Sequence, residues 1–237
     1  MKRAIVVGAS SGIGRELASV LAERGYVVGA TGRRAELLDE LSSGAGGRIV
    51  AAAFDACSSD IAKELGTLVE RLGGLDLFVF CAGTGDLNPD LDYGIESRTN
   101  RLNVDAFTAA VGFAYGYFAR HGGGHIAAVT SVMGLRGSGA APSYAASKAY
   151  QINYLEGLRQ KAAKERTGIT ITDLRPGSVE TDMMKGEGHF WIASPTEAAR
   201  VIAGAIGKKK AVAYVTPRWQ AVGTLLKWLP RNIHKNM

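Results

Sequence analysis

Several residue types and patterns that mark particular protein classes are scarce in this chain of 237 residues. It has only two cysteines, Cys57 and Cys81, with neither the spacing of metal ligands nor the frequency of a disulfide scaffold. Its four histidines form no cluster with the cysteines, so the sequence predicts no metal site. No apolar run reaches membrane-spanning length, and residues 1–3 lead directly into a short strand, so we expect no signal peptide. These absences favour a protein of the reducing cytoplasm.

Acidic residues are absent from the last part of the chain. After Glu197 there is no aspartate or glutamate, whereas eight lysines and arginines follow. Because the whole chain carries a formal charge of +6, residues 1–197 carry −2. The basic balance therefore belongs to the tail and not to the whole domain. No basic face with interleaved aromatic residues is visible, so we expect no nucleic acid as a partner.

Apolar strand-like segments alternate with amphipathic helical segments along the chain. Such alternation predicts an α/β protein with a Rossmann-type, doubly wound parallel sheet of about seven strands and helices on both faces, in a single domain. Residues 1–206 would form the catalytic and dinucleotide-binding part. Residues 207–237 would add the last strand and a basic amphipathic extension. The predicted strands cover residues 4–7, 27–31, 49–54, 75–80, 126–130, 169–174 and 211–215.

A glycine-rich turn follows the first predicted strand at once, and a helix with a stripe of apolar residues begins inside it. Glycines let the backbone approach a pyrophosphate, and a helix N-terminus offers free N–H groups and a partial positive charge. The order of strand, glycine turn and helix predicts a dinucleotide phosphate site. Its residues are Gly8, Ser10, Ser11, Gly12, Ile13 and Gly14.

Two arginines, Arg33 and Arg34, stand where the second predicted strand ends. In dinucleotide sites this position meets the adenosine ribose, where a carboxylate binds the 2′-hydroxyl of NAD and an arginine suits the 2′-phosphate of NADP. The alternative is an ordinary solvated pair at a helix start. Because no acid is present beside them, the sequence favours NADP(H) over NAD(H).

Two further strand ends and one helix carry candidate polar or small residues. Asp55, followed by Ala56, is placed to accept a hydrogen bond from the adenine amino group, or else caps the next helix. The small residues Cys81, Ala82 and Gly83 would let a cofactor lie close. Asn103 lies in a long predicted helix over residues 96–120, and as a buried polar residue it is either structural or functional.

The run from Ser131 to Lys148 carries the clearest chemistry. Tyr144 and Lys148 are four residues apart in a predicted helix over residues 144–164, so they share one face. An ammonium close to a phenol favours the phenolate and lowers the tyrosine pKa from its usual value near 10. Tyr-x-x-x-Lys also occurs by chance in many helices. Ser131, at a strand exit, is placed to bind the same substrate oxygen and favours the chemical interpretation.

With these residues the chain resembles the short-chain dehydrogenase/reductase family over roughly residues 4–206. The resemblance implies a nicotinamide cofactor and a catalytic tetrad of Asn103, Ser131, Tyr144 and Lys148. It makes Tyr144 the acid/base, Ser131 the group that polarises the carbonyl, and Asn103 the holder of a relay water. Lys148 would lower the tyrosine pKa and bind the nicotinamide ribose. A Pro176-Gly177-x-x-x-Thr181 motif also belongs to the resemblance, with Val179 and Thr181 orienting the carboxamide.

The resemblance and the loop composition together predict an NADPH-dependent reductase that converts a carbonyl compound reversibly into an alcohol. The apolar residues expected around the substrate suit a lipophilic ketone or aldehyde, although they also suit a packed lid. The alternatives are a non-catalytic NADP-sensing scaffold and a 3-oxoacyl-type reductase with a carrier-bound substrate. The expected substrate residues are Met133, Leu135, Met183, Met184, Phe190 and Trp191.

The C-terminal extension departs from the family pattern, because residues 211–237 lack the glycine-rich strand with which many members build a tetramer. We expect a homo-oligomer, either a dimer through the helices that hold Asn103 and Lys148 or a tetramer. The extension also contains a predicted helix over residues 219–229 with Trp219, Val222, Leu225, Leu226 and Leu229 on one stripe. This helix either packs on the fold or a partner subunit, attracts an acidic acyl carrier, or lies on an anionic membrane surface as a peripheral contact.

Overall fold

The seven strands of the chain form one parallel sheet in the order β3-β2-β1-β4-β5-β6-β7. The computed structural model describes residues 1–181, 190–228 and 230–234. The sheet confirms the predicted fold class, and each predicted strand is present with its ends shifted by a few residues. The strands are β1 Lys2–Val7, β2 Tyr26–Gly32, β3 Ile49–Ala53, β4 Leu77–Phe80, β5 Gly124–Val129, β6 Ile169–Pro176 and β7 Val212–Val215.

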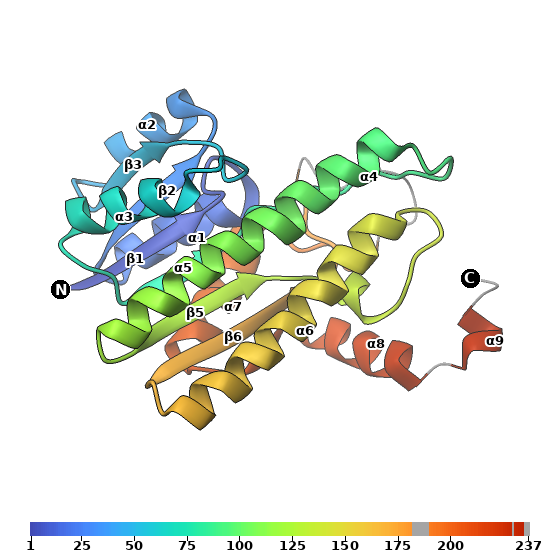
Figure 1. The fold of residues 1–237 in the computed structure, drawn as a ribbon. Helices are drawn as coiled ribbons and strands as arrows, with labels where there is room; N and C mark the ends of the chain where they lie inside the picture. The colour runs from blue at the N-terminus through green and yellow to red at the C-terminus, as the bar shows by residue number, and fades with distance from the viewer. Residues whose placement is uncertain (182–189, 229, 235–237) are drawn as a thin grey trace.

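Helices cover both faces of the sheet, as Figure 1 shows. The helices α1, α2 and α7 pack on one face, and α3, α5 and α6 pack on the other. Each face therefore has its own apolar core. The helical elements are α1 Gly12–Glu23, α2 Ala35–Ser43, α3 Ile61–Leu72, α4 Tyr93–Asn100, η1 Arg101–Ala106, α5 Phe107–Arg120, η2 Val132–Leu135, α6 Pro142–Glu165, α7 Pro195–Gly207, α8 Pro217–Trp228 and α9 Arg231–His234.

The strand order reverses between β1 and β4, which are neighbours in the sheet although two strands separate them in the sequence. In open α/β sheets such a switch point leaves a crevice at the carboxyl ends of the strands, where ligands bind. The glycine turn after β1, the small residues after β4 and Ser131 after β5 all lie at this edge. The topology thus brings together the segments that the sequence singled out.

The long helix predicted over residues 96–120 is interrupted. The described chain instead has α4, then the π-helical turn η1, then α5. Asn103 lies within η1 and is completely buried. π-Helical turns are rare and commonly occur at functional sites.

The helix α8 follows β7 and extends away from the sheet domain (Figure 1). Trp219 is 7% exposed and Leu225 is 65% exposed, so these two residues face different sides. The prediction that Leu225 belongs to the same packed stripe as Trp219 was therefore wrong. The cause is geometric, because six residues leave two side chains about 120° apart around a helix of 3.6 residues per turn. Leu229 lies outside the described residues.

None of the described helices combines the length and the apolar character needed to cross a membrane.

Candidate active site

Ser131 and Tyr144 meet at the carboxyl edge of the sheet. Ser131 follows β5 and caps the short helix η2, its Oγ accepting a hydrogen bond of 3.1 Å from the Met133 backbone N–H. Tyr144 lies in the first turn of α6, which Pro142 begins. The two side chains also form a hydrogen bond with each other. The predicted pair of hydroxyl groups is thus brought together by a strand end and a helix start.

The Tyr144 phenol is less acidic in the structure than the sequence predicted. Burial raises its pKa above the usual value, and only the hydrogen bond with Ser131 acts in the lowering direction. Lys148 is not among the causes of this shift, and the expected lowering of the Tyr144 pKa by its ammonium stays a prediction. The Lys148 Nζ atom lies 5.9 Å from the centroid of the Tyr144 ring, and it is directed to other acceptors.

Lys148 is held by two acceptors and is 3% exposed. Its Nζ donates hydrogen bonds to the Val129 carbonyl, at 3.1 Å, and to the Gln151 Oε1 atom, at 3.0 Å. Burial lowers the pKa of Lys148 to about 8, although the nearby Cys81 and Asp173 side chains act in the opposite direction. The ammonium is therefore close to its point of proton loss in the neutral to mildly alkaline range.

Gln151, which the sequence analysis missed, joins Lys148 to Asn103. Its Nε2 donates a hydrogen bond of 2.8 Å to the Asn103 backbone carbonyl while its Oε1 accepts from Lys148. The side chain is completely buried. Both ends of the amide are thus used, one for each partner. Gln151 lies three residues after Lys148, and that helical spacing is the only signal in the sequence that pointed to it.

The Asn103 side chain holds the loop that follows β4. Its Oδ1 accepts from the Thr84 backbone N–H at 3.0 Å, and its Nδ2 donates to the Thr84 carbonyl at 2.7 Å and to Ser147 Oγ at 3.0 Å. These bonds give Asn103 a structural role. The relay water that the resemblance implies for Asn103 stays a prediction, and the Asn103 carbonyl already accepts from Gln151.

The turn after β1 has the backbone of a phosphate cradle. Gly8 adopts a φ of +89°, and a Cβ atom on Gly14 would overlap the Gly8 carbonyl, so both positions require glycine. Ser11 precedes α1 with an extended backbone and makes no side-chain cap, which leaves the first N–H groups of the helix available. These features fit a pyrophosphate at the helix N-terminus. Ser10 and Ile13 complete this turn.

The two arginines at the end of β2 border the cradle. Arg34 Nη2 donates to Ser10 Oγ at 2.9 Å and to Ser11 Oγ at 2.6 Å. Arg33 is exposed. Burial raises the pKa of the Cys57 thiol, and the positive charge of Arg33 acts to lower it. Cys57 follows Asp55 and Ala56 after β3. The Asp55 Oδ1 accepts from the Cys57 backbone N–H at 2.9 Å and so caps its own turn and not α3.

The segment after β4 lies between the cradle and Tyr144. Cys81 donates its backbone N–H to the Val7 carbonyl at 2.8 Å, and burial raises the pKa of the Cys81 thiol to about 12. Ala82 lies directly against Gly8, and the close approach of a cofactor to these small residues stays a prediction. Gly83 leads on to Gly85, whose backbone packs on the Tyr144 ring.

The segment after β6 closes the other side of the cradle. The Thr181 methyl group lies close to Gly12, and Val179 is buried and pairs with Ala193 in an isolated bridge. Trp219 from α8 packs directly on the backbone of Gly177, which follows Pro176. The predicted residues after β6 thus face the glycine turn across the strand ends.

Comparison with known proteins is consistent with this geometry. The family described as short chain dehydrogenase matches residues 2–190. The chain belongs to that family. A protein of Myxococcus xanthus named an uncharacterized oxidoreductase is 33% identical over 188 residues, which are 77% of this chain and 74% of that protein. The short-chain dehydrogenases are oxidoreductases that use a nicotinamide cofactor and act on alcohol or carbonyl groups.

Solved structures share the whole fold of this short-chain dehydrogenase. A short chain dehydrogenase from Burkholderia cenocepacia J2315, solved in complex with NADP, has a TM-score of 0.84 at 23% identity and covers 100% of this chain and 98% of its own. The TT0495 protein from Thermus thermophilus has a TM-score of 0.81 at 27% identity and covers 93% of this chain and 99% of its own.

The expected substrate side of this short-chain dehydrogenase is lined by apolar residues from two separate segments. Met133 and Leu135 belong to η2, and Met133 is 40% exposed. Phe190 and Trp191 are exposed by 50% and 46%, and the Phe190 ring stacks on Trp219 of α8 with 5.1 Å between the ring centroids. Met183 and Met184 lie outside the described residues.

Proposed function

We propose that this short-chain dehydrogenase is an NADPH-dependent reductase that converts a lipophilic ketone or aldehyde reversibly into an alcohol. The observation that carries the proposal is the hydrogen-bonded pair of Ser131 and Tyr144 at the switch point of the sheet, beside a glycine cradle suited to a dinucleotide. Carbonyl reduction requires hydrogen-bond donors at the substrate oxygen, because negative charge develops on that oxygen. The hydroxyl groups of Ser131 and Tyr144 would provide two such donors.

Residues of this chain would donate the proton and position the substrate. The nicotinamide cofactor, when bound, supplies the hydride for the carbonyl carbon or takes it up in the reverse direction. Tyr144 would donate its phenolic proton to the carbonyl oxygen, and Ser131 would donate a hydrogen bond to the same oxygen. Loss of that proton leaves a phenolate, which the hydrogen bond with Ser131 stabilises. Lys148 would bind the nicotinamide ribose.

The preference for NADP(H) is supported by the charges at the end of β2. Arg34 is held over Ser10 and Ser11 by its hydrogen bonds, and Arg33 lies exposed beside it. A 2′-phosphate at this place would meet two guanidinium groups, which recognise phosphate well. A 2′-hydroxyl would find no carboxylate at these positions. Asp55 and Ala56 would then border the adenine.

The lipophilic substrate class is supported by the surroundings of Tyr144. The segments expected on the substrate side contain Met133, Leu135, Phe190 and Trp191, and the Arg218 guanidinium lies 5.7 Å from the Trp191 ring centroid. Ligand sites of this kind bury an apolar body and fix it with a few polar groups. The proposal also includes a homo-oligomer, with contacts through η1, α5 and α6, and a cytoplasmic location.

The deciding experiment follows turnover of a panel of ketones and aldehydes with NADPH and NADH at the nicotinamide absorbance. Tyr144→Phe should bind NADPH as the wild type does and lose reduction by about 1,000-fold or more, since it lacks the proton donor. Tyr93→Phe, at a tyrosine that is 81% exposed on α4, is the matched control and should keep full activity. Turnover unchanged in Tyr144→Phe, or none with any carbonyl compound, would refute the proposed reaction.

The cofactor preference has its own test. Arg34→Ala should raise the KM for NADPH by about tenfold, the equivalent of roughly 1.4 kcal/mol, and leave the KM for NADH nearly unchanged. Arg24→Ala is the control, because that arginine is exposed at the end of α1, away from the cradle. If the KM values for NADPH and NADH change equally, Arg34 only supports the turn that contains Ser10 and Ser11.

A further inference from the structure

The outer face of α8 is apolar and exposed. Leu225 is 65% exposed and Trp228 is 84% exposed, whereas Trp219 on the inner face is buried. Ala221, Leu225 and Trp228 follow one another at helical spacing, so they share the outer face. An open groove of about 620 Å³ runs along it. Exposed large apolar residues gathered on one helix face commonly mark a contact surface.

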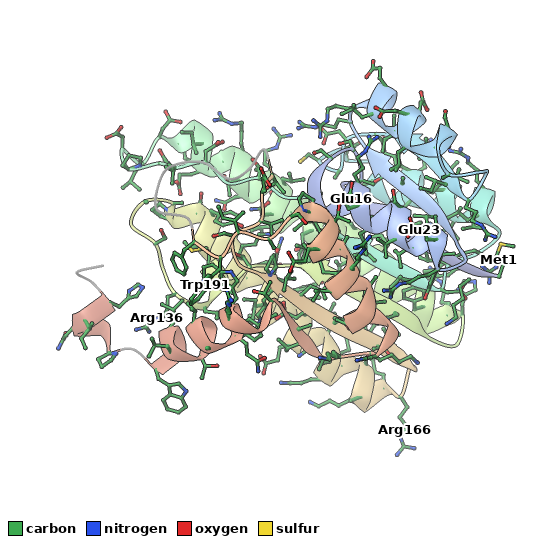
Figure 2. The ribbon with its side chains drawn as sticks, turned by 180° about the vertical axis from the view of Figure 1, so that it is seen from behind. Met1, Glu16, Glu23, Arg136, Arg166 and Trp191 are labelled. Carbon is green, nitrogen blue, oxygen red and sulfur yellow. The ribbon has the colours of Figure 1, made fainter. Side chains whose placement is uncertain are left out.

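The segment Phe190–Ile192 lies by the opposite, inner face of α8, where Trp219 packs. These three residues are 50%, 46% and 48% exposed. The Trp191 ring lies 6.1 Å from that of Trp219, centroid to centroid, and the Arg218 guanidinium lies 5.7 Å from the Trp191 ring centroid. In Figure 2, Trp191 lies along the same side of the molecule as α8. We call Ala221, Leu225 and Trp228, which line the groove on the outer face, the α8 surface.

The formal charges of the C-terminal segment have one sign. Residues 211–237 contain Arg218, Lys227, Arg231 and Lys235 and no aspartate or glutamate. In helical register, position 218 falls beside the outer face of α8, about 60° from position 221, whereas position 227 falls about 120° from position 221. An apolar face flanked by basic residues is the pattern of helices that lie in the interface of an anionic bilayer.

We propose that the α8 surface binds anionic lipid bilayers, with the outer face of α8 buried among the headgroups and upper acyl chains. The lack of acidic residues decides between a bilayer and a second copy of this chain. A symmetric contact through α8 would bring like charges together without counter-charges, whereas an anionic headgroup layer compensates them. The binding requires no catalytic step and is independent of the proposed reaction.

The test is sedimentation of the full chain with vesicles of phosphatidylcholine alone or mixed with phosphatidylglycerol. The wild type should bind the mixed vesicles at least tenfold better than the neutral ones, and binding should weaken as salt is raised, because salt screens the attraction. The variant Leu225→Ser/Trp228→Ser should lose at least tenfold of this binding. Tyr93→Ser is the matched control, since Tyr93 is 81% exposed on α4, and it should bind as the wild type does.

Light scattering and NADPH binding complete the design. All three proteins should bind NADPH equally, which shows that the domain is folded. Failure of the wild type to sediment with anionic vesicles would overturn the proposal, and so would equal binding by the double variant. If the wild type is a dimer in solution, and the double variant is a monomer while neither binds vesicles, the α8 surface is instead a contact between two copies.

Discussion

At the scale of single residues, the amide of Gln151 determines how Lys148 is held. Gln151→Leu keeps the volume but removes the acceptor of the Lys148 Nζ and the donor to Asn103. A hydrogen bond to a charged group favours the charged form, so its loss should lower the Lys148 pKa further below about 8. If charged Lys148 is required, the alkaline fall in activity should move down by about one pH unit.

The measurement is the pH dependence of kcat and of NADPH affinity. Gln160→Leu makes the same substitution at an exposed position of α6 and should leave both profiles in place. A purely structural role for Gln151 would lower activity at every pH without moving the alkaline limb. An unmoved limb would therefore exclude Gln151 as a positioning residue.

Gly85 is a second residue whose role follows from a tertiary contact that the sequence does not indicate. A Cβ atom at this position would overlap the Tyr144 ring, so Gly85→Ala should displace the phenol from Ser131. We expect kcat to fall by about 100-fold, since misplacement by about 1 Å has that effect, with little change in the melting temperature. Gly112→Ala has open space around it and is the control for both measurements. Full activity in Gly85→Ala would show that the ring adapts.

The sequence predicted those site residues that belong to ordered motifs, but not those that depend on contacts through space. The glycine turn, the two arginines, Ser131, Tyr144 and Lys148 follow strand ends or helical spacing, which a sequence displays. Gln151 and Gly85 have no motif, because their roles arise when α6 packs against η1 and against the loop after β4. The direction of the Tyr144 pKa depends on burial, which residue spacing alone does not give.

At the scale of elements, β5 and β6 are joined by a buried histidine. The His125 Nε2 and Thr172 Oγ1 atoms are 2.8 Å apart, and Thr172 Oγ1 donates to the Lys210 carbonyl, so His125 Nε2 must be the donor. Burial lowers the pKa of His125 from 6.5 to about 4. Between pH 6.5 and about pH 4, His125 is therefore protonated in the unfolded chain but not in the folded chain. The free energy of unfolding consequently decreases as the pH falls through this range.

The wild type should lose about 2 kcal/mol of unfolding free energy between pH 7 and pH 5 through this histidine. His125→Gln should remove that part of the pH dependence, and His121→Gln, on the exposed end of α5, should retain it. Urea unfolding at both pH values is the measurement. An equal slope in wild type and His125→Gln would assign the acid sensitivity to other groups.

The element boundaries show where local patterns suffice. Ser194 caps α7 by accepting from the Glu197 backbone N–H at 3.1 Å, an arrangement that a serine followed three residues later by a glutamate favours. The π-helical turn η1 was not predicted, because its residues have ordinary helical propensities. It is accompanied by contacts of Asn103 with Thr84 and Ser147, which are distant in the sequence. Tertiary contacts thus accompany a departure that propensity alone does not indicate.

At the scale of the whole molecule, the chain consists of a sheet with two cores and a helical arm attached beside the site. The two apolar cores include residues from β1 to α7 and β7, whereas α8 contacts the domain at β7 and η2. Trp219 is the main anchor of α8, since it packs on Gly177 and stacks on Phe190. The arm therefore depends on the domain, but the domain does not require the arm for its cores.

Trp219→Ala should consequently loosen α8 and leave the sheet domain folded. Removal of a buried tryptophan typically costs about 3–5 kcal/mol, which exceeds what a single short helix gains by itself in water. Trypsin should then cut the variant after Arg218 at least tenfold faster than the wild type, while the main thermal transition moves little. Trp228→Ala removes a tryptophan that is 84% exposed and should be cut at the wild-type rate. A large drop in the main transition of Trp219→Ala would show instead that the arm and the sheet domain fold as one cooperative unit.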